Sequence, residues 1–285
     1  MISQETFNKY YSNKHIQFEI VKCLKSKEVI FLGDKRVRCM VASQVTYLEQ
    51  NMDKFQFHET INNVYYSLAN FDWYKMKKEL GYGCFSFAHN KRKEQMVEFN
   101  ENANSLIKSY DLAIDFDNHD GDKYAEVYDD CNKLKNLFDK FKVSYSIKTS
   151  GSGFHMEVKH SKLPKNIKEI KDIIVRVKKL GELMTDIKLI LELDTMDVGE
   201  VGNVEIGSFY DTRRIFKVPY TIDYKTGNVA LPLTDVQFEL LKEKDYLKDL
   251  CNPVSVMNLN LFNRGILERE GTSEGFDNLL REVYY

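Results

Sequence analysis

The amino-acid sequence predicts an α/β protein in which a sheet is flanked by helices. One observation is the helical periodicity of 122–141, where apolar side chains recur on one face. A second is the pair of alternating apolar and polar runs at 144–149 and 154–160, which is typical of two strands. Segments of both kinds recur along the 285 residues, and the strand-like segments cluster in the centre and late part of the chain.

The first half of the chain has three further patterns. Apolar residues at helix-like intervals predict a helix over 5–26, and two short apolar runs around a glycine predict a hairpin over 28–40. The run Tyr110–Asp117 predicts a strand that ends in a polar turn. The remaining expected elements are a helix at 60–79, an aromatic strand at 81–88 and the turn at 118–121.

The second half repeats these patterns after the helix at 122–141 and the strand pair. The spacing of isoleucine, valine and leucine predicts a buried helix face over 165–186. A further helix is expected at 234–249, whereas 250–285 has no clear periodicity. Short strands are expected at 188–194, 204–208, 214–219 and 228–231.

The composition is that of an ordinary globular protein and excludes several classes. Hydrophobic residues make up 43% and charged residues 29%, and no apolar run is long enough to span a membrane. The five cysteines lie far apart without a CxxC pair, which argues against structural zinc and disulfides and for a reducing interior. The net charge of −2 argues against bulk electrostatic binding of nucleic acid, although short basic strips remain.

Two carboxylates stand side by side in the strand that ends near residue 117. Asp115 and Asp117 are two positions apart, so both point to the same face of the strand. Their mutual repulsion is relieved by a divalent cation, and Mg²⁺ accepts one or two carboxylates together with substrate phosphates. The alternative is a solvated strand end that helps to form the turn at 118–121.

The turn between the paired strands is rich in glycine and serine. Successive backbone N–H groups in such a turn can converge on an anion, and the serine hydroxyls add donors. His155, on the returning strand, can donate to a phosphate oxygen. The alternative is a simple glycine hairpin with a surface histidine. The four turn residues are Ser150, Gly151, Ser152 and Gly153.

A third group follows later in the chain. Glu205 supplies another carboxylate, and Arg214, Lys217 and Lys225 are spaced along a strand and a turn, where they could hold phosphates. Each of these charges alone is more often a surface charge. Their joint occurrence with the acid pair and the glycine turn, each at a strand end, indicates metal-assisted phosphoryl or nucleotidyl transfer.

These motifs resemble those of the catalytic (small) subunit of the archaeal and eukaryotic DNA primases. The resemblance runs through most of the chain. DLAIDFD is similar to the family's DxD metal motif, and SGSGFH to its nucleotide motif. RRIFKVPYTIDYKTGNVALPL resembles the closing segment, and TFNKYYSNKHIQFEIVKCLKSKEVIF the opening helices and first strand.

The chain departs from the family pattern at several positions. Glu205 stands nine residues before Arg214, where the family has its third metal-binding aspartate. SGSGFH is one residue shorter than the common form and lacks its basic residue, and Asp223 replaces a histidine that usually precedes KTG. The family's zinc-binding cysteine cluster is missing, and Cys131 with His119 cannot complete a tetrahedral site.

The resemblance implies a primase-polymerase fold, with a central mixed or antiparallel sheet, as one catalytic domain over 1–285. It implies a helical insertion at 161–187 and a helical C-terminal extension at 234–285 without an assigned role. The implied activity is two-metal, template-directed synthesis of short RNA or DNA primers from nucleoside triphosphates during replication. Mg²⁺ or Mn²⁺ would be held by Asp115, Asp117 and Glu205.

The same resemblance implies the nucleotide site and the partners. The partners are single-stranded DNA and a large subunit with an iron–sulfur cluster, in a heterodimer. The implied location is intracellular, in the cytoplasm or nucleoid for an archaeal-type protein and in the nucleus for a eukaryotic one. The implied nucleotide-binding residues are Ser150, Gly151, Ser152, Gly153, His155, Arg214, Lys217, Asp223, Lys225, Lys27, Arg36 and Arg38.

Three other functions remain open from the sequence. A related primase-polymerase for repair, lesion bypass or plasmid replication would use the same site. A non-catalytic subunit with the primase fold, which only binds nucleic acid or a partner, is indicated by Glu205, Asp223 and the shortened turn. The acid pair alone also allows an unrelated metal-dependent nuclease.

Overall fold

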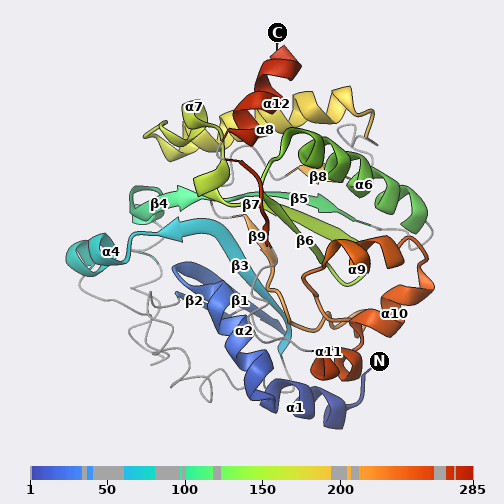
Figure 1. The fold of residues 1–285 in the computed structure, drawn as a ribbon. Coiled ribbons are helices and arrows are strands. Elements are labelled where there is room, and N and C mark those ends of the chain that lie inside the picture. Colours follow the sequence, from blue (N-terminus) through green and yellow to red (C-terminus); the bar gives the residue numbers. More distant parts are fainter. Residues whose placement is uncertain are drawn as a thin grey trace.

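The fold consists of helices and two antiparallel sheets, which confirms the predicted α/β class (Figure 1). The structure is a computed structural model that describes residues 2–33, 37–40, 61–80, 97, 101–117, 123–193, 204–206, 212, 214–259, 268–272 and 274–284. The predicted strand at 81–88, the turn at 118–121 and Arg36 lie outside these ranges, and only the backbone is described for Arg38 and Glu205. Within the described ranges, no helix is long and apolar enough to cross a membrane.

The first sheet has the strand order β2-β1-β3-β4, and β9 also pairs with β3. The predicted hairpin is confirmed, since Glu28 on β1 pairs with Met40 on β2. The strands are β1 (Lys27–Gly33), β2 (Val37–Met40), β3 (Ile61–Phe71), β4 (Ile107–Tyr110) and β9 (Ile215–Lys217).

The helix predicted at 60–79 is wrong over most of its length. Ile61–Phe71 is the long strand β3, and helix α4 (Trp73–Leu80) begins only after it. Val64, Tyr66 and Leu68 alternate along β3 and are buried, which is the two-residue period of a strand. Strand β3 pairs with β1, β4 and β9, which provide hydrogen-bond partners for its backbone. This pairing with distant strands overrides the helix-like pattern of the local sequence.

The second sheet has the strand order β10-β6-β7-β5-β8. The predicted strand pair is confirmed as β6 and β7, which face each other across the glycine turn. The strand expected at 110–117 is divided at Asp111 between β4 of the first sheet and β5 of the second. The strands are β5 (Leu112–Phe116), β6 (Tyr145–Thr149), β7 (Phe154–Val158), β8 (Val204–Ile206) and β10 (Glu268–Arg269).

The helices predicted at 5–26, 122–141, 165–186 and 234–249 are present, but the first and third are interrupted by a capping residue, and the last is divided at 241–244. Asn13 divides the helix expected at 5–26, because its side chain accepts from the first backbone N–H groups of α2. Asp172 caps α8 in the same way and separates it from α7. The helices of these regions are α1 (Gln4–Ser12), α2 (Lys14–Leu24), α6 (Tyr124–Phe141), α7 (Lys165–Lys168) and α8 (Ile173–Ile190).

Two of the short predicted strands do not form as expected. Residues 188–190 are the last turn of α8, where Ile187 and Lys188 continue the buried face of the helix, so the strand over 188–194 is wrong there. Residues 228–231 contribute an isolated bridge, Ile222 with Val229, instead of a strand. The later helices are α9 (Asp235–Leu240), α10 (Asp245–Cys251), α11 (Pro253–Asn258) and α12 (Gly275–Tyr284).

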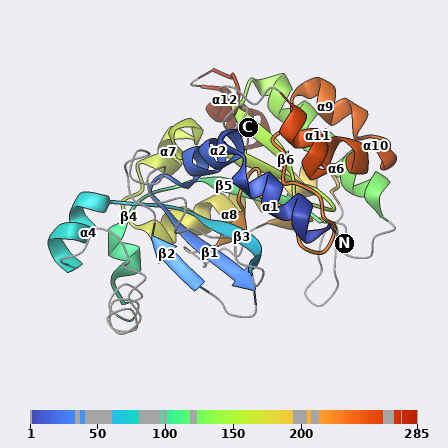
Figure 2. The ribbon, with the colours of Figure 1, turned by 90° about the horizontal axis from the view of Figure 1, so that it is seen from below.

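Helices cover both sheets, and the first helix meets a late segment of the chain. Helix α6 contacts β5 and β7, and α2 contacts β1. Helix α1 lies beside α11 in both views (Figures 1 and 2). Tyr10 donates its hydroxyl hydrogen to the carbonyl of Tyr220 at 2.9 Å, and the amide of Ile222 donates to the Tyr11 hydroxyl at 2.9 Å. These buried hydrogen bonds fix the segment that follows β9.

Candidate active site

Four polar residues lie in one row across the second sheet. Lys148 on β6 pairs with His155 on β7, and His155 pairs with Asp115 on β5. Asp115 in turn pairs with Glu205 on β8. Directly paired positions of antiparallel strands lie on the same face. Strand pairing therefore brings three predicted site residues to neighbouring positions, although they are far apart in the sequence.

Asp115 and His155 make the closest contact in this row. His155 Nε2 lies 3.2 Å from Asp115 Oδ1, and the histidine side chain is 6% exposed. Burial would raise the pKa of Asp115, but the charges of His155, Arg214 and Lys148 hold it below its ordinary value. Asp115 Oδ1 is buried with this ion-pair contact but no hydrogen bond of good geometry, and His155 Nδ1 is buried without a hydrogen-bond partner. Such buried atoms are suited to a ligand that supplies a cation and an acceptor.

Asp117 lies one residue beyond the end of β5 and acts on the same neighbours as Asp115. The charges of both aspartates raise the pKa of Tyr65 on β3, after the larger effect of burial. The same two charges also oppose the lowering of the Lys217 pKa by burial. Both carboxylates are therefore within electrostatic reach of Tyr65 and Lys217 on the first sheet.

The donor set suits a hard divalent cation. Carboxylate oxygens are the protein ligands that Mg²⁺ takes, usually one or two together with substrate phosphates. Among the described side chains no group of three or more His, Cys, Asp and Glu residues is arranged to hold a metal. The side chain of Glu205 is not among the described ones, but its backbone lies opposite Asp115 in the sheet.

The glycine turn packs closely on the end of β5. The Ser150 amide donates to the Gly153 carbonyl at 2.9 Å, and the Gly153 amide donates to Ser150 Oγ at 3.1 Å. A Cβ on Gly153 would lie 2.0 Å from the carbonyl oxygen of Phe116, so only glycine allows this approach. The turn therefore lies against the backbone that carries Asp115 and Asp117.

A second turn, over 223–228, is attached to the first. Asn228 Nδ2 donates to the Gly151 carbonyl at 3.0 Å. A Cβ on Gly151, where φ is +114°, would lie 2.7 Å from Asp223 Cβ. Asp223 forms a buried ion pair with Lys217 of β9, whereas Lys225 is exposed at the tip of the turn. The predicted nucleotide residues of the two motifs thus form one packed unit.

Arg214 and Phe216 border the site from the first sheet. The His155 ring meets the Phe216 ring edge to face, with 4.9 Å between centroids. The guanidinium carbon of Arg214 lies 6.0 Å from the centroid of the Phe216 ring. The predicted cation Arg214 is therefore close enough to influence Asp115, as its effect on the pKa of that carboxyl shows.

Lys27 has different contacts from those expected of a nucleotide ligand. It is buried, its Nζ lies 2.8 Å from Asp111 Oδ2, and it donates to the Leu68 carbonyl at 3.1 Å. These contacts tie β1 to the segment between β4 and β5. Arg38 is placed on β2 opposite Ile30 by its backbone. The nucleotide or template roles of Lys27, Arg36 and Arg38 stay predictions.

Sequence reasoning missed a buried polar cluster next to the site. Lys148 forms an ion pair with Glu157, and its Nζ lies 3.1 Å from the hydroxyl of Tyr66 on β3. Glu157 also accepts a hydrogen bond from the Tyr66 hydroxyl. The sequence signal for this cluster was the presence of Lys148 and Glu157 inside predicted strands, each two positions outside the segment 150–155. Because charged residues are rarely buried without a partner, they predict a pair.

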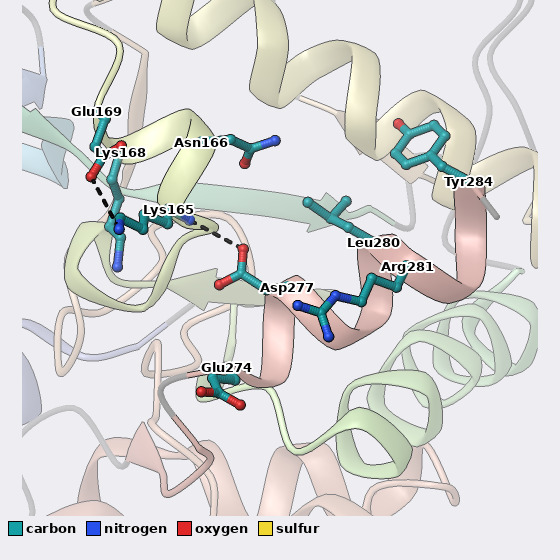
Figure 3. A pocket seen from close by; sticks show the side chains of 9 residues that line it. All are labelled: Lys165, Asn166, Lys168, Glu169, Glu274, Asp277, Leu280, Arg281 and Tyr284. Carbon is teal, nitrogen blue, oxygen red and sulfur yellow. Dashed lines mark hydrogen bonds and ion pairs between the residues drawn. The ribbon is translucent and has the colours of Figure 1, made fainter.

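A pocket of about 880 Å³ lies elsewhere, between α7 and α12 (Figure 3). Its walls carry charges of both signs, among them Lys168, Glu274 and Arg281. Asp277 accepts the backbone N–H of Lys165 at 3.2 Å and so joins the two helices. None of the residues predicted for catalysis or nucleotide binding lines this pocket.

Comparison with known proteins finds likenesses among solved structures. No family model matches the chain, and no curated protein matches its sequence. Among solved structures, the chain is similar to the polymerase domain of ligase D from Mycobacterium tuberculosis in complex with DNA. The TM-score is 0.46 with 11% identical residues, over 96% of this chain and 88% of that chain. A likeness at this level assigns neither a family nor a function.

Proposed function

We propose that the chain is a DNA-directed nucleotidyltransferase of the primase type, acting as a DNA primase catalytic subunit. The observation that carries this proposal is the row of His155, Asp115 and Glu205 across three paired strands. Asp117 and the glycine turn lie at the end of the same central strand. This arrangement supports a phosphate site next to a set of carboxylates, which metal-assisted nucleotidyl transfer would require.

The carboxylates would hold the metal ions of this reaction. Asp115 and Asp117 on β5, with Glu205 on β8, would bind two Mg²⁺ or Mn²⁺ ions. With such ions bound, the site would lower the pKa of a primer 3′-hydroxyl and stabilise the leaving pyrophosphate. His155, only 3.2 Å from Asp115, orients that carboxylate on the side away from Glu205.

The remaining residues bind and orient the nucleotide. In the turn over 150–153 the Ser150 and Gly153 amides already donate within the turn, so the Gly151 and Ser152 N–H groups and the serine hydroxyls are the proposed donors to phosphate. His155 donates a hydrogen bond to the triphosphate. Arg214, Lys217 and Lys225 neutralise the charge that develops during transfer. The proposed substrates are nucleoside triphosphates, paired to a single-stranded DNA template.

The proposed product is a short RNA or DNA primer for DNA replication. The net charge of −2 gives the chain little general attraction for DNA. We therefore place much of the DNA contact on a partner, and the proposed partner is a large subunit with an iron–sulfur cluster.

A primer-synthesis assay tests the proposal. Purified protein is given unprimed single-stranded DNA, labelled nucleoside triphosphates and Mg²⁺ or Mn²⁺, and is compared with the variant Asp115→Asn/Asp117→Asn. New labelled oligomers with the wild type, and none with the variant, are expected. A matched control is Asp245→Asn/Asp249→Asn, which changes two exposed aspartates on α10. Unchanged synthesis by the Asp115/Asp117 variant would end the two-metal assignment.

The same assay separates a primase from a repair-type primase-polymerase. A primase starts new chains on bare single-stranded DNA, whereas an enzyme that extends only a supplied primer belongs to the second class. Both templates are therefore run side by side, with and without a large subunit.

One observation favours a non-catalytic subunit as the second candidate. Lys217, proposed to bind phosphate, is engaged in a buried ion pair with Asp223. A subunit that has lost catalysis would tolerate this pair and the glutamate at position 205. Absence of product on primed and unprimed DNA, with a large subunit present, is the result expected for that candidate.

A further inference from the structure

Lys217 is shared between two groups of carboxylates. Its ammonium forms an ion pair with Asp223, and the two side chains are 6% and 11% exposed. The charges of Asp115 and Asp117 act on the same ammonium. Lys217 is therefore within the electrostatic reach of both the second turn and the acid pair.

Asp223 is held firmly on the side away from Lys217. Its Oδ1 accepts from the Thr226 amide at 2.9 Å and from the Thr226 hydroxyl at 3.1 Å. Gly151 packs against its Cβ, so the carboxylate has little room to move. The ion pair uses the other oxygen, Oδ2. The carboxylate is thus a fixed part of the turn, and Lys217 is the longer and more adaptable partner.

A phosphate that enters beside the glycine turn meets this pair. It is attracted by the ammonium of Lys217 and repelled by the carboxylate of Asp223, which is the nearest anion attached to the turn itself. Lys217 has three N–H donors and can turn toward a phosphate, but it then gives up part of its contact with Asp223. A polyphosphate therefore binds more weakly, because its binding disrupts part of the ion pair between Lys217 and Asp223.

We propose that Asp223 is a positioning residue that holds Lys217 in the nucleotide site and keeps the affinity for polyphosphate low. This inference rests on the proposed function and adds a role for Asp223 to it. The low affinity favours release of the pyrophosphate product, because the ion pair between Lys217 and Asp223 forms again as the pyrophosphate leaves. Asp223 does not touch the reacting atoms in this arrangement.

The test measures binding of inorganic tripolyphosphate and pyrophosphate to the full chain by calorimetry, in EDTA and again in Mg²⁺. Asp223→Asn keeps an oxygen that can accept from Thr226 but removes the negative charge. We expect both anions to bind about tenfold more tightly, because one neighbouring charge shifts a pKa by at least about one unit. Lys217→Met should weaken binding. The double variant should bind as weakly as Lys217→Met, because the gain depends on the free ammonium.

Steady-state kinetics supply the second readout. Asp223→Asn should lower KM for the nucleotide and also lower kcat, because pyrophosphate leaves more slowly. A merely structural role for Asp223 predicts the reverse for KM, together with a lower melting temperature that Thr226→Val would share. Asp245→Asn, an exposed aspartate on α10, is the matched control and should change neither quantity.

The outcomes separate this inference from the proposed function. If Asp223→Asn binds the two anions no more tightly than the wild type, while primer synthesis depends on Asp115 and Asp117, the inference alone is overturned. Absence of binding to both proteins while synthesis continues also overturns the inference alone. Absence of both binding and synthesis overturns the inference and the proposed function together. Tighter binding that disappears in the double variant supports the inference even if the wild type makes no product.

Discussion

Lys27 and Asp111 are 84 positions apart in the sequence and form a buried ion pair, with 2.8 Å between Lys27 Nζ and Asp111 Oδ2. Lys159 lies 3.5 Å from the same carboxylate oxygen, and the His160 amide donates to the other at 2.8 Å. Burial would raise the pKa of Asp111, but the two lysines hold it well below its ordinary value. The pair fixes the point where the chain passes from β4 of the first sheet to β5 of the second.

Removal of one partner of this pair should destabilise the protein strongly. Asp111→Asn leaves the Lys27 ammonium buried without a counter-charge, which costs about 3–5 kcal/mol in such pairs. The free energy of unfolding from urea titration measures the effect. The control is Glu169→Gln, which breaks the exposed pair with Lys165 and should cost less than about 1 kcal/mol. Similar small costs for both variants would show that the buried pair does not stabilise the fold.

Stability at acid pH should depend on Glu157. Burial would raise the pKa of this carboxyl, but Lys148, Lys159 and the Tyr66 hydroxyl lower it from 4.5 to about 2. Since the folded-state pKa is the lower one, the stabilisation is fully present above pH 4.5 and is lost as the pH falls toward 2. Urea titrations between these pH values should show that the free energy of unfolding falls less steeply for Glu157→Gln than for the wild type. The variant should start from a lower free energy of unfolding. Equal slopes for both proteins would contradict this assignment.

The glycine turn should tolerate no side chain at position 153. In Gly153→Ala the new Cβ collides with the Phe116 carbonyl, so the turn must move away from the strand that carries Asp115. We expect a large loss of nucleotide incorporation together with reduced stability. Gly271→Ala is the control: its Cβ would lie 2.2 Å from the carbonyl oxygen of Lys142, away from the predicted site residues. It should also reduce stability but leave incorporation nearly intact. Equal activity of the two variants would refute the close packing of the turn.

Replacement of His155 should act mainly on nucleotide binding. His155→Ala removes the proposed donor to the triphosphate, and a hydrogen bond to a charged group is worth about 1.5–3 kcal/mol. KM for the nucleotide should therefore rise roughly tenfold or more, with a smaller change in kcat. His15→Ala, on the exposed side of α2, serves as the control. A variant with unchanged KM and reduced kcat would instead assign His155 to the chemical step.

Local patterns predicted the elements that a short stretch of chain defines by itself. The helix at 122–141 has one continuous apolar face, and the strand pair is joined by a four-residue turn, so neighbours in sequence decide both. Strand β3 was missed because its pairing partners are β1, β4 and β9, which lie far away in the sequence. The alternation of Val64, Tyr66 and Leu68 is a local strand signal, but the asparagines around it weaken that signal.

The candidate site shows the same division between local and distant information. The spacing of Asp115 and Asp117 predicts a shared face from the strand period alone, and this shared face stays a prediction. Their neighbours could not be derived, because the register of β7 and β8 against β5 decides them. The ion pairs Lys148–Glu157 and Lys217–Asp223 depend on burial, which composition does not reveal.

The hydrogen bonds of Tyr10 and Tyr11 to residues 220 and 222 constrain how the chain folds during synthesis. Each bond joins positions about 210 residues apart, so the first helix cannot reach its final place until most of the chain has left the ribosome. Until then α1 can pack on α2 but lacks its contacts with α11 and with residues 220 and 222. The contacts of Asp223 with Lys217 and of Asn228 with Gly151 also wait for this late segment, so a ribosome stalled before residue 220 would carry an incomplete form of the proposed site.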